Sequence, residues 1–122
     1  MEWKKPDEGL VELLSKEMEG MGEKRKMFGY PVYFINGNMF IGVHGDNLFM
    51  RLSQEDRVEI STSYPQVTPF TPREGTTMKE YVTLPEDVYN DLDVLREWRD
   101  RSFEYASNLP PKKKKQKKNK EK

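Results

Sequence analysis

Residues 27–52 read MFGYPVYFINGNMFIGVHGDNLFMRL, the most apolar stretch of the chain. They predict three β-strands joined by two tight turns. Asn36-Gly37 lies between alternating apolar runs and favours a type I′ turn, in which both central residues need a positive φ. Gly45-Asp46 favours a type II′ turn with glycine first. The stretch therefore predicts an antiparallel three-stranded meander.

Two-residue loops at both turns predict the strand register. Phe34 then faces Met39, and the same register pairs Val32 with Ile41, Tyr30 with Val43, Val43 with Leu48 and Ile41 with Met50. Because side chains alternate across a strand, one continuous apolar face follows from this register. Its members are Tyr30, Val32, Phe34, Met39, Ile41, Val43, Leu48, Met50 and Leu52. A slip of one residue in either hairpin would destroy that face.

The chain before the meander predicts a helix over Asp7–Glu19. Leu10, Leu14 and Met18 recur at helical spacing, and acidic residues suit the helix N-terminus. Glu23–Lys26 is then a charged link into the sheet. Pro31 lies inside the first strand of the meander, which predicts an edge strand or a bulge there, because proline cannot donate to the ladder.

Two strands and two helices are predicted after the meander. Ser53 has the character of an N-cap for a short helix that ends near Thr62. Short strands are expected over Val67–Phe70 and Met78–Leu84. Proline suits the first turn of a helix, so one long final helix is predicted from Pro85 to Asn108. Its apolar stripe comprises Val88, Leu92, Leu95, Trp98 and Tyr105.

The predicted order of elements is α-β-β-β-α-β-β-α, so the fold class is α+β. We expect a two-layer α-β3-α-β2-α arrangement, with an antiparallel sheet and helices on one face. A chain of 122 residues suits one domain. We assign residues 1–109 to that domain and residues 110–122 to a disordered Lys-rich tail.

The formal net charge of zero combines two opposite parts. Residues 112–122 carry eight lysines and one glutamate, whereas the other 111 residues carry 13 basic and 20 acidic side chains, a net of −7. There is no cysteine, which excludes disulfides and thiolate chemistry. No apolar run is long enough for a membrane helix, and the first residues lack a signal-peptide core. The expectation is a soluble, cytoplasmic protein with no membrane association.

The motifs of common enzymes are missing from the sequence. There is no nucleophile elbow, phosphate-binding loop or dinucleotide-binding glycine motif. His44 is the single histidine, and a histidine next to a β-turn is more often a partly exposed turn residue than a metal ligand. We expect no enzyme, no cofactor and no metal. A hydrolase or isomerase that uses His44 is the weaker alternative.

Two groups of residues are candidate interaction sites. The second face of the meander carries Tyr33, Phe40, Phe49 and Arg51, an aromatic patch that would be exposed if helices cover the other face alone. A contact with a partner or with a second copy is one reading, and burial under another segment of the chain is the other. The second group is the tail, whose lysines can bind polyanions without sequence choice. It comprises Lys112, Lys113, Lys114, Lys115, Lys117 and Lys118.

Short motifs in a fixed order span most of residues 8–107. They are Lys26-Met27-Phe28-Gly29, Asn36-Gly37-Asn38-Met39-Phe40, Asn47-Leu48-Phe49-Met50-Arg51-Leu52, Thr68-Pro69-Phe70, Met78-Lys79-Glu80-Tyr81-Val82, Leu84-Pro85 and Trp98. As an ordered set, they resemble the N-terminal domain of the TfoX/Sxy competence regulators. The chain departs from that pattern at Tyr30-Pro31, where the family usually has further glycine.

The resemblance implies a fold similar to secretion chaperones and a regulatory role in transcription. It implies action through protein partners, such as the transcription machinery, and no catalytic residues. The first hypothesis is therefore a non-enzymatic regulatory or adaptor module. The alternative is a non-specific nucleic-acid binder that acts through the basic tail. Removal of the tail separates the two, because an adaptor keeps its activity without it.

Overall fold

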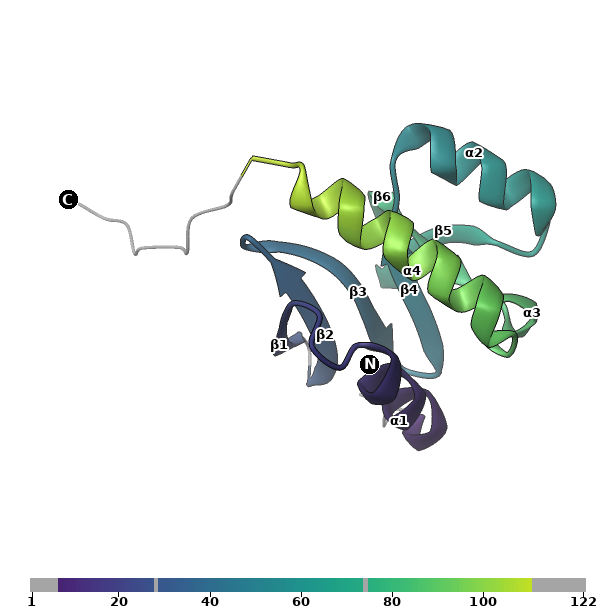
Figure 1. The fold of residues 1–122 in the computed structure, drawn as a ribbon. Helices are drawn as coiled ribbons and strands as arrows, with labels where there is room; N and C mark the ends of the chain where they lie inside the picture. The colour runs from purple at the N-terminus through teal and green to yellow at the C-terminus, as the bar shows by residue number, and fades with distance from the viewer. Residues whose placement is uncertain (1–6, 28, 74, 111–122) are drawn as a thin grey trace.

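The computed structural model describes residues 7–27, 29–73 and 75–110. Within these residues, six strands form one antiparallel sheet in the order β1-β2-β3-β4-β6-β5. The strands are β1 (Glu23–Met27), β2 (Tyr30–Ile35), β3 (Asn38–His44), β4 (Asn47–Arg51), β5 (Thr68–Arg73) and β6 (Thr76–Leu84). The helices are α1 (Glu8–Glu17), α2 (Gln54–Ser63), α3 (Glu86–Tyr89) and α4 (Leu92–Ser107) (Figure 1). The predicted α+β class is confirmed.

The first two predicted helices are present, and each begins at a polar cap. The Asp7 side chain accepts a hydrogen bond from the backbone N–H of Leu10 at 3.1 Å. The Ser53 hydroxyl accepts one from the N–H of Asp56 at 3.1 Å. Such caps satisfy backbone donors that the helix itself leaves without a partner. Both capping residues were recognisable from the sequence alone.

Both predicted turns of the meander are confirmed. Asn36 and Gly37 have φ of 54° and 81°, and Gly45 has φ of 63°. The β3–β4 pairs also follow the prediction, since Val43 lies opposite Leu48 and Ile41 opposite Met50.

A β-bulge between β2 and β3 overturns part of the predicted register. Phe34 lies opposite Met39 as expected, but Tyr33 pairs with Ile41, which leaves Phe40 as an extra residue in β3. The predicted pair of Val32 with Ile41 is wrong, because Val32 faces Gly42. A bulge shifts every residue beyond it to the other face of the sheet. Val32 therefore leaves the helix-covered face, and Tyr33 joins it.

The charged link predicted at Glu23–Lys26 is in fact an edge strand. β1 pairs with β2 along its whole length, from Glu23 opposite Phe34 to Met27 opposite Tyr30. The prediction of an edge strand around Pro31 is therefore wrong, because β1 covers β2 on that side. The bulge lies at Phe40 rather than at Pro31, which sits beyond the paired part of the β2–β3 ladder.

The predicted single helix from Pro85 to Asn108 is interrupted. α3 ends at Tyr89, and α4 begins at Leu92. The Asp91 carboxylate caps the new helix by accepting from the N–H groups of Asp93 and Val94 at 3.1 and 3.4 Å. An aspartate that satisfies the first donors of a helix favours a fresh start at that position.

All helices pack on one face of the sheet, as predicted. The buried residues on that face form the main core, which takes Leu10 and Leu14 from α1, Ile60 from α2, Val88 from α3, and Leu95, Trp98 and Ala106 from α4. α4 crosses in front of the central strands (Figure 1). Its Ser102 hydroxyl donates to the carbonyl oxygen of Phe40 at 3.0 Å. The bulge is thus held directly under α4.

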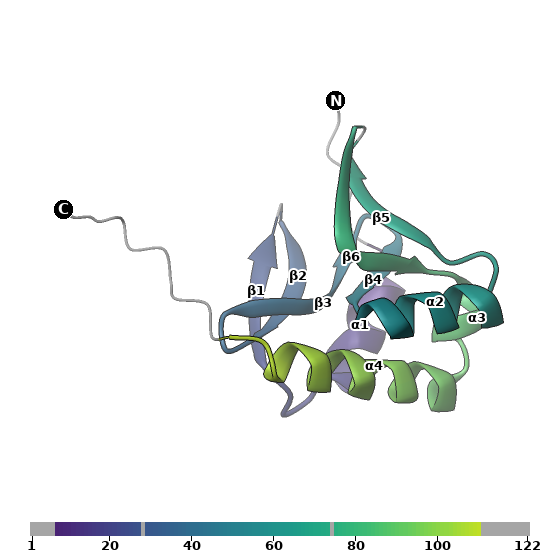
Figure 2. The same cartoon turned by 90° about the horizontal axis from the view of Figure 1, so that it is seen from above.

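The other face of the sheet encloses a second core of its own. Figure 2 shows the β1–β2 and β5–β6 hairpins both bending away from α4, so that the sheet curls around this face. The enclosed residues are Val32, Met39, Phe49, Phe70 and Tyr81, with Met27, Phe34 and Met78 packed against them. The Tyr81 hydroxyl donates to the carbonyl oxygen of Met39 at 2.8 Å. Among the described residues, no helical side chain belongs to this second core.

Candidate protein-interaction surfaces

The four residues predicted as one exposed aromatic face do not form such a face. Tyr33, Phe40 and Phe49 are 6%, 0% and 0% exposed. The bulge turns Tyr33 and Phe40 toward the helices, where both lie in the main core. Phe49 lies in the second core instead. The premise of exposure was therefore wrong, and a partner role for these side chains stays an untested prediction.

The curling of the sheet explains why Phe49 is buried. Its ring stacks on that of Phe70 with centroids 4.2 Å apart and an interplanar angle of 11°. Tyr81 meets the Phe49 ring edge-on at 6.0 Å. β5 is separated from β4 by β6 in the sheet order, so this stacking requires the sheet to fold over its own face. Sequence alternation indicated the face of Phe49 but not what covers it.

Arg51 is held in a polar cluster between β4, β6 and α4. Its Nε donates to Glu80 Oε1 at 2.7 Å, and its guanidinium lies 5.5 Å from the ring centre of Tyr81 and 6.0 Å from that of Tyr105. Burial would raise the pKa of Glu80, but the hydrogen bond and charge of Arg51 outweigh it and lower that pKa. Arg51 therefore neutralises a carboxylate within the fold.

His44 closes the β3–β4 hairpin opposite Asn47. Its ring lies 4.8 Å from that of Tyr30 and 5.5 Å from that of Phe70, and it is half-buried. Burial lowers the pKa of this imidazole below its ordinary value. Within the described ranges, no group of three or more His, Asp and Glu side chains is placed to hold a metal ion.

The arginines of α4 are engaged in ion pairs that tie the helix layer together. Arg96 makes a two-pronged contact with the Glu17 carboxylate of α1, at 2.7 and 3.2 Å. Arg99 donates to the Glu17 backbone oxygen at 2.8 Å. Arg101 contacts Glu59 Oε1 of α2 at 2.9 Å. These cations therefore compensate neighbouring carboxylates within the helix layer.

Glu17 predicts a pH dependence of stability. Its pKa is lowered mainly by the hydrogen bond from Arg96, with the charges of Arg96 and Arg99 adding to this against the opposing effect of burial. A carboxylate with a depressed folded-state pKa stabilises the fold above its unfolded pKa, and this contribution is lost as pH falls through the folded-state value. We expect the melting temperature of Glu17→Gln to lie below that of the wild type near pH 7. This difference in melting temperature should shrink below about pH 4.5.

Glu12→Gln is the matched control for that measurement. Glu12 lies on the same helix, and its contact with Lys16 is exposed and 4.0 Å long. Melting curves from pH 7 to pH 3 should show little change for this variant. If the difference in melting temperature between Glu17→Gln and the wild type is the same at every pH, the stabilising role of the ionised Glu17 carboxylate is contradicted.

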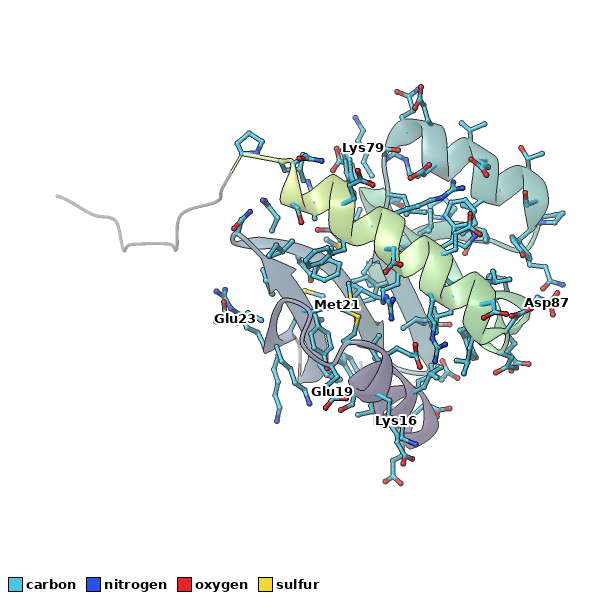
Figure 3. The ribbon with its side chains drawn as sticks, viewed as in Figure 1. Lys16, Glu19, Met21, Glu23, Lys79 and Asp87 are labelled. Atoms are coloured by element: carbon cyan, nitrogen blue, oxygen red, sulfur yellow. The ribbon has the colours of Figure 1, made fainter. Side chains whose placement is uncertain are left out.

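A groove of about 460 Å³ lies between α2 and the β5–β6 hairpin. Its lining comprises Gln54, Arg57, Val58, Ser61, Thr62, Thr68, Pro69, Lys79, Tyr81 and Val82, two basic residues and no acidic one. Val58 is 61% exposed, more than any other large apolar side chain in the described part of the chain. Figure 3 shows Lys79 near α2. In the described part of the chain, Lys79 forms no ion pair.

The sequence carries a signal for this groove in the spacing of two apolar residues on α2. Val58 and Ile60 are two residues apart on α2, and residues at that spacing lie on nearly opposite sides of a helix. Ile60 is fully buried in the main core, so Val58 must face outward.

Other predictions concern parts that the structure does not describe. The lysines Lys112, Lys113, Lys114, Lys115, Lys117 and Lys118 lie outside the described residues, so their role and the domain division at residue 110 stay predictions. In the described part of the chain, none of the helices combines the length and apolar character needed to cross a membrane.

The comparisons with known proteins agree with the resemblance seen in the motifs. The family model described as TfoX N-terminal domain matches residues 12–106, from within α1 to nearly the end of α4. No curated protein matches the chain significantly.

Proposed function

Because the chain belongs to the TfoX N-terminal domain family, we propose that it is a non-enzymatic regulatory adaptor that acts through a protein partner. The role that the family suggests is control of transcription, and the partner would then belong to the transcription machinery. A cytoplasmic location fits such a role.

The groove beside α2 is the observation that carries this proposal. It combines an exposed apolar side chain, Val58, with the cationic groups of Arg57 and Lys79. Arg57 is anchored in place, since its Nη1 donates to the carbonyl oxygen of Leu52 at 2.6 Å. A concave surface that combines an exposed apolar side chain with cationic groups suits protein recognition.

Site-specific photo-crosslinking in cells tests the proposal. A photo-crosslinking amino acid at position 58 should give a discrete, nuclease-resistant adduct with another protein. The exposure of Val58 makes the replacement harmless to the fold. The matched control is position 92, because Leu92 is also apolar and 40% exposed but lies on α4. No protein adduct at position 58, or equal adducts at both positions, would contradict the groove as the docking site.

Nucleic-acid binding through the tail is the second candidate function, and eight lysines in residues 112–122 favour it. Such binding would fade with rising salt and show little sequence preference. The net charge of −7 on the other residues opposes DNA docking by the folded part. A chain that ends at Pro111 should lose all binding to a labelled duplex if this candidate is right.

A further inference from the structure

We propose that β1 is a docking edge that accepts an extended acidic segment of a partner protein as a seventh strand of the sheet. This proposal is independent of the groove beside α2, because β1 and the β5–β6 hairpin lie at opposite edges of the sheet. It rests on the position of β1, its charge and the contrast between the two sheet edges.

β1 stands at the end of the strand order, with β2 on one side and no described strand on the other. An edge strand carries backbone N–H and C=O groups that can pair with another chain. Strand addition of this kind is a common way for a sheet to bind an extended peptide, with main-chain hydrogen bonds supplying affinity. Within the described structure, no strand occupies the outer side of β1.

The two edges of the sheet differ in their capacity to accept a strand. β5 forms the other edge and contains Pro69 and Pro72, neither of which has an N–H to donate. β1 contains no proline within Glu23–Met27, so every residue keeps its donor. Proline is one of the devices that block unwanted pairing at an edge. The prolines remove donors from one edge, whereas the charged side chains of β1 leave its donors in place and restrict pairing to strands of complementary charge.

The charge of β1 selects the kind of strand that it accepts. Lys24, Arg25 and Lys26 are consecutive, and both lysines are exposed. The Arg25 guanidinium forms an ion pair with Glu23 at 3.0 Å. Its central carbon also lies 4.6 Å from the centre of the Phe34 ring. Among the described residues, neither Lys24 nor Lys26 forms an ion pair. Opposite charges across a strand pair stabilise it, so an acidic partner strand is favoured.

The same charges argue against other occupants. Antiparallel pairing with β1 of a second copy, centred on Arg25, would set Lys24 opposite Lys26 of that copy, and like charges directly opposite are destabilising. The segments of this chain outside the description are also net basic, namely residues 1–6 and 111–122. Nucleic acid offers negative charge but no strand to hydrogen-bond with the edge. A partner protein fits both the charge and the backbone.

The test uses the full chain and a labelled peptide of alternating glutamate and valine. We expect saturable binding by fluorescence anisotropy, and about tenfold weaker binding to the double variant K24E/K26E. The matched control is K16E, compared with the single variant K24E, because each reverses one charge at an exposed lysine and Lys16 lies on α1, outside β1 and outside the groove lining. This control should bind the peptide as the wild type does.

A second peptide separates strand addition from simple charge attraction. It has the same sequence with alternate backbone nitrogens methylated, which keeps the charge and removes the donors. We expect it not to bind. Absence of binding by the unmethylated peptide, equal binding by both peptides, or an equal loss of affinity for K16E and K24E would overturn the proposal. So would displacement of the peptide by duplex DNA, or a concentration-dependent dimer that K24E/K26E abolishes.

Discussion

Phe49→Ala is expected to lower the free energy of unfolding by about 3–5 kcal/mol, the cost of deleting a fully buried phenylalanine. The side chain is 0% exposed and stacks on Phe70 at 4.2 Å. Its loss removes both the buried apolar area and the ring contact that joins β4 to the curled edge of the sheet. Urea denaturation followed by tryptophan fluorescence measures the change.

The same variant tests whether the second sheet face is closed in solution. An exposed aromatic patch would lose little stability on truncation, because exposed apolar groups gain little from folding. Val58→Ala is the control, since Val58 is 61% exposed and should change stability by less than about 0.5 kcal/mol. Similar denaturation midpoints for Phe49→Ala and wild type would mean that the curled sheet opens in water.

Gly22→Ala is expected to destabilise the protein by about 2–4 kcal/mol, the sum of two costs. Gly22 has φ of +74°, a left-handed conformation that is strained for any side chain. An added Cβ would also lie 2.7 Å from the backbone oxygen of Phe34 and 3.0 Å from the ring of Phe40. A backbone atom cannot swing aside, so the start of β1 would have to move away from β2.

Gly20→Ala separates the two costs. Gly20 has φ of +78° but nothing within 4 Å of an added Cβ, so only the conformational strain of about 1–2 kcal/mol applies. The difference between the variants in urea denaturation reports the close approach of the chain to Phe34. If Gly22→Ala and Gly20→Ala lose the same free energy of unfolding, the position of Gly22 close to Phe34 is contradicted.

The parts of the fold that the sequence predicted well are those with local causes. Asn36-Gly37 and Gly45-Asp46 need special backbone angles, and Asp7 and Ser53 satisfy the first donors of a helix, so each leaves a signature within four residues. β1 was missed because its charged sequence shows no apolar alternation. The break before α4 had a signature in Asp91, but the continuous apolar stripe obscured it.

The errors about the candidate site have a tertiary cause. The extra residue at Phe40 has no local signature, since it depends on how β3 packs beneath α4. One shift at that point moved Tyr33 from the predicted patch into the main core. Phe49 lies on its predicted face, but Phe70 of β5, two strands away in the sheet, stacks on it and covers it. Alternation shows which residues share a face and gives no information on what covers that face.

The docking of α4 also constrains the order of events during synthesis. The helix completes the core through contacts distant in sequence, since Ser102 binds Phe40, Arg99 binds Glu17, and the Asn38 side chain donates to the Pro110 carbonyl oxygen at 3.1 Å. A nascent chain that ends before Trp98 would carry all six strands but would lack the part of the apolar cover that α4 provides. Uncovered apolar surfaces aggregate or recruit chaperones, and contacts of high sequence separation slow folding. Ribosome-bound chains should therefore resist protease only after the last turn of α4 has left the exit tunnel.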